Sequence, residues 1–348
     1  MTNAPHLFSP LAKPGFIQLR NRTVMSAMSR SFADDGHFAT PAMAEYYRKR
    51  SAGGAGLILT EGTIIDKSGD GWNQVPYIAS DAHADAWRPV VDAVHAEGGT
   101  IACQLWHMGR ISHEDYTGHA PVSSTNRAAA GVNRQNNKPF GEPRALAADE
   151  MPAVYQLFVD AARRALSVGF DAVELHGANG YIVDQFLDRQ VNDRTDQYGG
   201  SVENRCRFLL ELVDAVVAAV PANRVMLRIS PSRFMGGLYE WPDLEAMIAW
   251  LVPELTKRRL GALDISCANS IYADTSGRVV RMVRPLWPGV LIAGASLTPD
   301  AAEAEVAQGH LDGVTWGRLF IANPDLAAKV QAGSELTPFE DAMRGTLV

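Results

Sequence analysis

The chain is short of cysteine and lacks long apolar runs. Its three cysteines, Cys103, Cys206 and Cys267, lie far apart without a Cys-x-x-Cys pair. They offer no disulfide framework or metal site and favour a reducing compartment. No segment reaches the roughly 18 uninterrupted apolar residues of a membrane span, and the N-terminus shows no basic-then-apolar signal pattern. We therefore expect a cytoplasmic protein with no membrane partner.

Clusters of positive charge and a dinucleotide fingerprint are also missing. The formal net charge is -7 and Lys and Arg are dispersed, which argues against nucleic-acid binding. No Gly-x-Gly-x-x-Gly follows an early strand, so neither FAD nor a nicotinamide held tightly in a Rossmann domain is expected. The 47% hydrophobic content of the 348 residues is enough for a large buried core. A small molecule is the expected partner.

Apolar, β-branched runs bounded by Gly, Pro or polar turns predict eight strands. They lie near residues 23–28, 56–62, 100–106, 171–176, 224–230, 262–267, 289–294 and 312–317. Helical patterns separate most of them, and the clearest begins after Ser201 as N-cap and stops at Pro221. The alternation predicts an α/β protein, a single (β/α)8 TIM barrel over residues 1–348. An open doubly wound sheet is the structural alternative.

One region departs from this alternation. Residues from about 111 to 148 are rich in Gly, Pro, Asn and Ser and are too many for an ordinary strand-to-helix connection. We predict that they form a capping excursion, or lid, after the third strand.

Alternation within three strands indicates which polar side chains enter the barrel. In the third strand, for example, Ile101, Cys103 and Leu105 share the apolar face. The residues on the opposite faces of strands three, four and five are Gln104, Trp106, Glu174, His176, Arg228 and Ser230. Gln104, Trp106, His176 and Arg228 come late in their strands and should converge at the carboxyl end, where barrel enzymes assemble active sites. The alternative is a barrel filled with paired polar groups, such as Glu174 with Arg228.

Three polar side chains follow the fourth strand within six residues: His176, Asn179 and Tyr181. The imidazole and the carboxamide can both donate to one oxygen. A phenol with an unperturbed pKa of about 10 is a neutral proton donor at pH 7. This set of groups is suited to the reduction of an activated double bond.

The run that begins at His176 resembles the signature of the Old Yellow Enzyme family of FMN-dependent ene-reductases. The residues that carry the resemblance are His176, Gln185, Phe186, Leu187, Asn192, Arg194, Asp196, Tyr198, Gly199, Gly200, Ser201, Asn204, Arg205, Arg207 and Phe208. The resemblance extends over nearly the whole chain. It implies non-covalent FMN in the barrel and NAD(P)H as a reducing co-substrate.

The same resemblance assigns flavin contacts. Ser29 would lie near the flavin C4 carbonyl, Gln104 at the pyrimidine edge and Arg228 beside N1, where its charge stabilises the reduced anion. The residues expected at the phosphate are Gly294, Ala295, Ser296, Gly317 and Arg318. Ser29 stands where the classical branch of the family generally has threonine.

The implied reaction is ping-pong. Hydride passes from the nicotinamide to flavin N5 and then to the β-carbon of an electron-poor alkene. His176 and Asn179 hold the carbonyl or nitro oxygen, and Tyr181 protonates the α-carbon. Trp106 and Trp72 line the substrate side. The chain ends soon after Leu336, so the pocket wall that many members build from a later segment must be missing or built otherwise.

Other functions stay open at this point. A reductase of nitrate esters or nitroaromatics could use the same site, and a non-catalytic flavin redox sensor would need only the cofactor. A metal-dependent barrel hydrolase could use His107, His113, His119 and His176, but their irregular spacing argues against it and no metal is expected. The protein is expected to be a monomer or a homodimer.

Overall fold

Eight parallel strands form a closed barrel in the computed structural model, which describes residues 4–234, 237–267 and 270–348. The barrel strands are β1 (Thr23–Met25), β2 (Leu57–Leu59), β4 (Ile101–Trp106), β7 (Ala172–Gly177), β8 (Val225–Ile229), β11 (Ala262–Asp264), β12 (Val290–Ala293) and β13 (Gly313–Trp316). Pairing of β1 with β13 and of β2 with β4 closes the circle. The predicted TIM barrel is confirmed, and each predicted strand overlaps one barrel strand.

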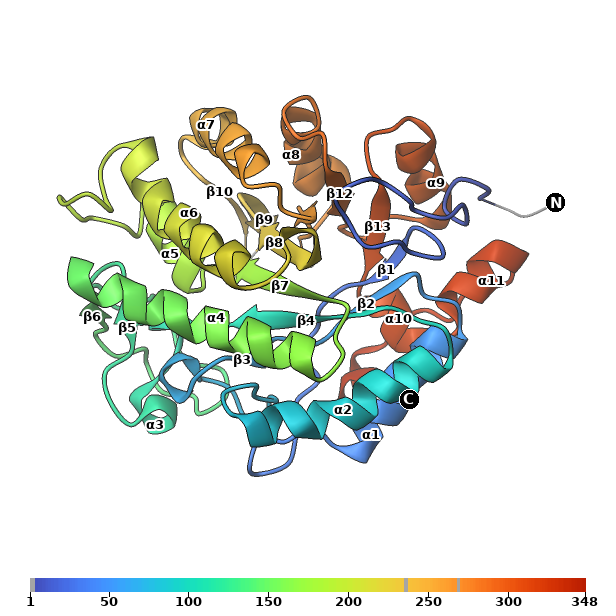
Figure 1. Ribbon diagram of the computed structural model, residues 1–348, viewed down its shortest axis with the longest axis horizontal. Helices are drawn as coiled ribbons and strands as arrows, with labels where there is room; N and C mark the ends of the chain where they lie inside the picture. Colours follow the sequence, from blue (N-terminus) through green and yellow to red (C-terminus); the bar gives the residue numbers. More distant parts are fainter. Residues whose placement is uncertain (1–3, 235–236, 268–269) are drawn as a thin grey trace.

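Helices surround the strands (Figure 1). They are α1 (Pro41–Ala52), α2 (Asp81–Ala96), α3 (Glu114–Thr117), α4 (Met151–Ser167), α5 (Ile182–Leu187), α6 (Val202–Ala219), α7 (Leu244–Lys257), α8 (Ser276–Val283), α9 (Pro299–Ala307), α10 (Arg318–Ala322) and α11 (Leu326–Ala332). The predicted start of α6 is confirmed, because the Ser201 side chain accepts the Asn204 N–H. This cap satisfies a backbone donor that the first helical turn leaves unpaired.

Two apolar layers lie on opposite sides of the strands. The outward residues of β4, Ile101, Cys103 and Leu105, belong to the large core that packs against the helices. The inward residues near the strand starts form a second core. Its members are Leu11, Phe16, Leu19, Val24, Leu57, Leu59, Ala102, Ala172, Met226, Ala262, Val290 and Ile292. The N-terminal segment thus fills the amino end of the barrel, and polar side chains are confined to the carboxyl end.

Short elements extend the barrel at that carboxyl end. The lid lies between β4 and α4 and contains η2 (Gly109–Ile111), α3, β5 (Val122–Ser123), β6 (Arg144–Ala145) and η3 (Ala148–Glu150). In Figure 1 its strands and α3 lie at the left, beyond the end of β4. The strand β3 (Thr63–Ile64) with η1 (Lys67–Gly69), and the hairpin of β9 (Ser232–Phe234) and β10 (Leu238–Glu240), were not predicted. The remaining turns are η4 (Ala222–Arg224), η5 (Tyr272–Asp274) and η6 (Asp341–Gly345).

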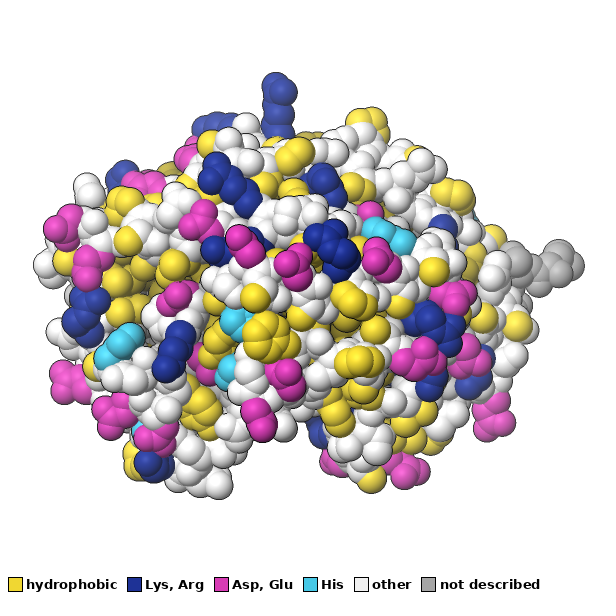
Figure 2. All heavy atoms as spheres, turned by 60° about the horizontal axis from the view of Figure 1, so that its bottom comes forward, with side chains coloured by type: hydrophobic (Ala, Val, Ile, Leu, Met, Phe, Trp, Pro, Cys, Tyr) yellow, Lys and Arg dark blue, Asp and Glu magenta, His cyan; other side chains and the backbone are white. Residues whose placement is uncertain are grey.

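The surface carries mixed charge. On the face shown in Figure 2, Lys and Arg lie among Asp and Glu, and hydrophobic side chains are scattered between them. That face therefore offers no broad positive surface for a polyanion. Among the described residues, no helix combines the length and the apolar character needed to cross a bilayer.

Candidate active site

A cavity of about 840 Å³ opens at the carboxyl end of the barrel. Its walls come from the segments after β1, β11, β12 and β13 together with Arg228 of β8. Seven of the eight residues predicted to hold a cofactor line it: Ser29, Arg228, Gly294, Ala295, Ser296, Gly317 and Arg318. The eighth, Gln104, is buried beneath it in the barrel. Residues 268–269 lie outside the described part of the chain, so the lining is known for the described residues only.

The loop after β1 is fixed by a buried carboxylate. Glu61 accepts the backbone N–H groups of Arg30 at 2.9 Å and Ser31 at 3.0 Å. Burial raises the pKa of Glu61 to about 7. Ser31 has a positive φ of 62°, and its hydroxyl accepts the Trp72 indole N–H at 3.0 Å. Glu61 and Trp72 together hold a strained turn whose neighbour, Ser29, lines the cavity.

Close backbone packing shapes the opposite wall. A Cβ on Gly294 would lie 2.0 Å from the carbonyl oxygen of Thr315, so only glycine lets the segment after β12 lie against β13. The following Ser296 has a positive φ of 54°. Arg318 begins α10, and its guanidinium carbon lies 5.4 Å from the centre of the Phe339 ring. Backbone amides, a hydroxyl and a guanidinium thus gather in one place, as phosphate binding requires.

An aromatic cluster adjoins the cavity through Trp72. The Trp72 and Trp106 ring centres lie 6.1 Å apart, and Trp106 lies 4.9 Å from Tyr181. His176 lies 5.0 Å from Tyr181 and 6.2 Å from Trp106. The inward face of β4 and β7 therefore brings together Trp106 and His176, two of the four side chains that the sequence predicted to converge, and Tyr181 joins them from the turn after β7. Of this cluster, only Trp72 lines the 840 Å³ cavity itself.

The turn that carries Asn179 and Tyr181 is held by two buried groups. Asn179 has a positive φ of 59°, and its backbone N–H donates to the Ser230 hydroxyl at 2.8 Å. The next amide, that of Gly180, donates to Asp184 at 2.6 Å. Asp184 is fully buried and pairs with Arg233 at 2.8 Å. The turn is therefore positioned by the barrel interior and by the β9–β10 hairpin that carries Arg233.

A polar layer lies across the barrel beneath the cavity. Gln104 donates to Glu174 at 2.7 Å, and Arg228 lies 3.8 Å from Asp264. The alternative pairing of Glu174 with Arg228 is therefore not the one observed, since the nearest carboxylate to Arg228 belongs to Asp264. Burial, and then the charge of Asp264, raises the pKa of Glu174 to about 8. Burial also raises the pKa of Asp264, against the lowering effect of Arg228.

The protonation states of His176 and Tyr181 follow from burial. Burial, and then the positive charge of Arg228, lowers the pKa of His176 well below its usual value. The imidazole is therefore neutral at pH 7, with one N–H donor. Burial raises the pKa of Tyr181 to about 12, so the phenol keeps its proton throughout the physiological range. His176 can hold an oxygen, and Tyr181 can release a proton to a basic carbon.

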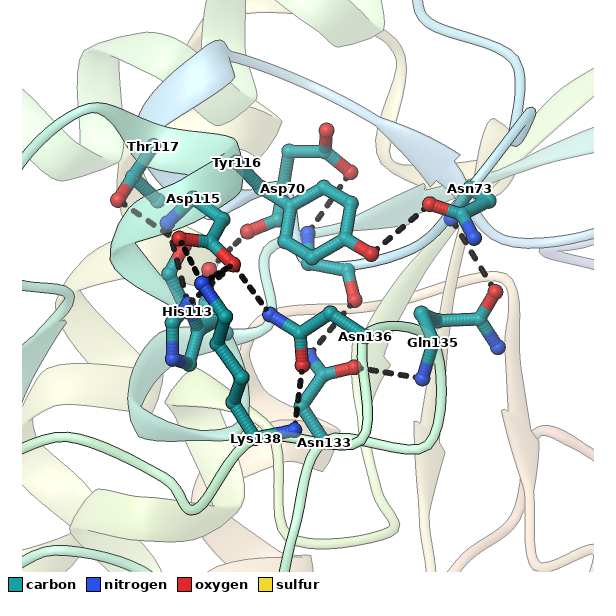
Figure 3. Close-up of polar contacts among 12 residues, drawn as sticks. Asp70, Asn73, His113, Asp115, Tyr116, Thr117, Asn133, Gln135, Asn136 and Lys138 are labelled. Carbon is teal, nitrogen blue, oxygen red and sulfur yellow. Dashed lines mark hydrogen bonds and ion pairs between the residues drawn. The ribbon is translucent and has the colours of Figure 1, made fainter.

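Polar contacts fasten the lid onto the loop that carries Trp72 (Figure 3). Tyr116 donates to the Asn73 side chain at 2.8 Å, and Asn133 donates to the Gly71 carbonyl at 3.0 Å. Gln135 accepts the Asn73 backbone N–H at 3.3 Å and also lines the cavity. The lid thus holds the residues on both sides of Trp72, and the predicted excursion is part of the site.

Several buried polar atoms at this end have no hydrogen-bond partner in the protein. Arg228 Nε, Trp106 Nε1 and His176 Nδ1 make no hydrogen bond. Buried polar groups in proteins are nearly always paired, so these three indicate a ligand with polar atoms above the barrel. The four histidines of the metal-hydrolase alternative do not gather. Among the described residues, no group of three or more His, Cys, Asp or Glu side chains could hold a metal ion.

Sequence reasoning missed part of the site. Asp264 and Ser266 could have been found by applying the parity rule to the sixth strand, where Leu263 and Ile265 face outward. Ser266 lines the cavity and bonds to Thr315, the inward residue of β13, at 2.6 Å. No local pattern marks several other lining residues that were missed, among them Gln135, Cys267, Leu336 and Arg344. Leu336 and Arg344 form part of the wall of this cavity.

Comparison with known proteins gives a consistent result over the whole chain. Residues 6–337 match the model of the NADH:flavin oxidoreductase / NADH oxidase family. The chain is 38% identical to 12-oxophytodienoate reductase 7 of Oryza sativa subsp. japonica, over 96% of this chain and 89% of that protein. It is 39% identical to a probable flavin mononucleotide-dependent alkene reductase of Leishmania infantum, over 91% and 88%.

Solved structures agree with these relatives. The old yellow enzyme homologue from Zymomonas mobilis superposes with a TM-score of 0.91 at 34% identity, covering 98% of this chain and 97% of that one. Morphinone reductase superposes with a TM-score of 0.90 at 37% identity, covering 98% and 93%.

Proposed function

The chain belongs to the NADH:flavin oxidoreductase / NADH oxidase family as an FMN-dependent alkene reductase of the Old Yellow Enzyme group, and from this we propose the reaction that its site performs. The enzyme reduces the activated C=C bond of α,β-unsaturated carbonyl or nitro compounds with NADH or NADPH. The name of the Leishmania infantum relative, an alkene reductase, supports this substrate class.

The residues present fit FMN. Arg228, whose Nε makes no hydrogen bond in the protein, lines a cavity that is also lined by two glycine-bearing segments and Arg318. The residues that would hold the cofactor are Ser29, Gln104, Arg228, Gly294, Ala295, Ser296, Gly317 and Arg318. Bound FMN supplies two-electron hydride chemistry, accepting from the nicotinamide and donating to the alkene.

The side chains of the aromatic cluster orient the substrate. His176 and Asn179 donate to its carbonyl or nitro oxygen and stabilise the negative charge that develops there, because fixed donors in a buried site need little reorganisation. Tyr181 then gives its proton to the α-carbon. Trp72 and Trp106 form the apolar walls of this pocket. Nicotinamide and alkene occupy the same space in turn, which makes the kinetics ping-pong.

The observation that carries the proposal is the convergence of His176 and Tyr181, 5.0 Å apart at their ring centres, with the fixed Asn179 turn beside a cavity that Arg228 lines. A proton donor and two oxygen-binding donors at one edge of a cofactor cavity are what alkene reduction needs. The same donors would accept a nitro group or a nitrate ester, so these compounds belong in the test. A redox sensor would not need a proton donor.

Anaerobic stopped-flow spectroscopy tests the proposal. The yellow protein should be bleached by NADH or NADPH and reoxidised by cyclohexenone, maleimide or a nitroalkene, with a nitrate ester as the competing substrate. Reoxidation by the nitrate ester alone would assign the alternative reaction. Bleaching without reoxidation by any of these acceptors would point to the sensor and contradict the proposal.

We also propose that residues 1–348 act as one domain in the cytoplasm, as a monomer or homodimer. The three scattered cysteines support a reducing compartment. Size-exclusion chromatography with light scattering would measure the oligomeric state, and a mass above that of a dimer would contradict it.

A further inference from the structure

The cofactor cavity gathers positive charge in a chain whose formal net charge is -7. Four arginines line it, Arg30, Arg228, Arg318 and Arg344, and among its described lining residues there is no Asp or Glu. Arg30 and Arg228 are buried, whereas Arg318 and Arg344 are exposed at the outer end of the cavity. This lining favours a ligand with more than one negative charge.

A single aromatic ring connects the two outer arginines. The guanidinium carbon of Arg318 lies 5.4 Å from the centre of the Phe339 ring, and that of Arg344 lies 5.1 Å from it. Cation–π contacts with one ring keep both guanidiniums in the same part of the cavity. An anion bound near both guanidiniums would offset the repulsion between their like charges.

The backbone around Arg344 is fixed by a buried side chain. Arg30, which is 6% exposed, donates from Nη2 to the carbonyl oxygens of Met343 at 3.0 Å and Thr346 at 2.5 Å. Arg50 is fully buried and donates to the carbonyl of Val348. The C-terminal segment is thus docked against the barrel, and Arg344 occupies a defined place in the cavity wall.

The ion pair of Arg344 with Asp341 does not account for the position of Arg344 in the cavity wall. Arg344 Nε lies 3.0 Å from Asp341 in an i,i+3 ion pair whose side chains are 55% and 85% exposed. Exposed pairs of this kind contribute little to stability. Among the described residues, no carboxylate lies within ion-pair distance of Arg318. Both guanidiniums therefore keep donors available for an incoming anion.

We propose that Arg344 is a second phosphate-binding arginine, which acts with Arg318 on the phosphate monoester of FMN. The inference rests on the proposed function and extends it, since Arg318 is the only arginine that the family resemblance assigns to this group. A phosphate monoester carries a charge of about -1.5 to -2 at pH 7, and two planar guanidiniums match that charge and its three acceptor oxygens. The phosphates of NADPH share this chemistry and are the competing source.

A competition experiment on the holoenzyme isolates the phosphate. The FMN-loaded protein is incubated with increasing riboflavin, which lacks the phosphate, and the bound flavins are quantified after rapid gel filtration. The midpoint gives the preference for FMN over riboflavin. Arg344→Ala should lower this preference about fivefold to tenfold, as expected for one charge-assisted contact at an exposed site. Arg318→Ala should lower it as well.

The chain offers a matched control. Arg88 forms an exposed i,i+3 ion pair with Asp85 on α2, outside the cavity, so Arg88→Ala should leave the preference unchanged. Arg344→Gln keeps a polar side chain with the aliphatic stem up to Cδ, removes the charge, and should lower the FMN preference in the same way if Arg344→Ala does not fold. Higher salt should reduce the difference in FMN preference between the wild type and the two Arg344 variants.

Three results would overturn the inference. The preference could stay at the wild-type value in both Arg344 variants. Both flavins could be lost equally, which would make Arg344 a support for the C-terminal segment. The KM for NADPH could rise, with the KM for NADH and the flavin preference unchanged, which would assign Arg344 to the nicotinamide. A wild-type protein that binds neither flavin would instead contradict the proposed function.

Discussion

The Ser230 hydroxyl holds Asn179 at two points. It accepts the Asn179 backbone N–H at 2.8 Å and donates to the side-chain Oδ1 at 3.3 Å. With Oδ1 occupied, the amide Nδ2 is the free end of the carboxamide, and no protein acceptor among the described residues bonds to it. Ser230 thus acts as a positioning residue for the second oxygen-binding donor of the proposed reaction.

Replacing this serine tests the arrangement. Ser230→Ala should slow alkene-driven reoxidation about threefold to tenfold, the usual contribution of one hydrogen bond, and leave bleaching by NADH or NADPH nearly unchanged. Ser232→Ala is the control, because the Ser232 hydroxyl is buried nearby without a partner. Equal slowing of both half-reactions, measured by stopped-flow absorbance, would mean that Ser230 has only a structural role.

Much of this geometry could be predicted because successive residues of a barrel strand alternate between the barrel interior and the side that packs against the helices. The apolar register of β4, β7 and β8 identified Gln104, His176 and Arg228 as inward residues. The apolar pattern of one strand shows which of its residues face inward, so the prediction required no information about neighbouring strands. The carboxyl-end rule then brought the late residues together.

Contacts between distant segments could not be predicted in this way. The Glu61 carboxylate that fixes the loop of Ser29 follows the next strand, β2, and is 31 residues from Arg30 in the chain. Arg344 reaches the cavity because Arg30, more than 300 residues earlier, binds the backbone around it. Neither contact leaves a periodic pattern, since each depends on a single side chain reaching across the fold.

Tyr181 gives a prediction about the proton. Tyr181→Phe should slow reoxidation by cyclohexenone at least about 100-fold, the lower range for a general acid, and leave reduction by the nicotinamide intact. Since burial raises the pKa of the wild-type phenol to about 12, the wild-type rate of reoxidation should not fall as pH rises from 6 to about 10. Stopped-flow traces across that range provide the measurement. A fall with a midpoint near pH 8 would assign the proton to another group.

Glu174 gives a prediction about stability and pH. Its folded pKa of about 8 lies above its ordinary value of 4.5, so between these values the folded state binds more protons than the unfolded state. The favourable contribution of Glu174 to the free energy of unfolding is therefore fully present below pH 4.5 and is lost as pH rises through 8. Glu174→Gln, which can still accept from Gln104, should raise the melting temperature relative to wild type by a few degrees at pH 9 and by less at pH 5.

The control for this experiment is an exposed carboxylate. Glu142→Gln, in the lid, should shift the melting temperature equally little at both pH values, since Glu142 is exposed. Thermal unfolding followed by circular dichroism on FMN-saturated protein provides the measurement. A stabilisation by Glu174→Gln that is larger at pH 5 than at pH 9 would reverse the sign and contradict the assignment of a raised pKa.

Trp72 gives a prediction about substrate size. Its ring lines the cavity, lies 6.1 Å from Trp106 and is held by Ser31, so it limits the room beside the aromatic cluster. Trp72→Ala should raise kcat/KM for a bulky enone relative to cyclohexenone by about tenfold, as expected when an apolar wall is removed. Trp250→Ala is the control, because Trp250 packs against the outer core on α7 and does not line the cavity. An equal change in kcat/KM for both substrates in Trp72→Ala would show that the indole supports the loop after β1 and does not select substrates by size.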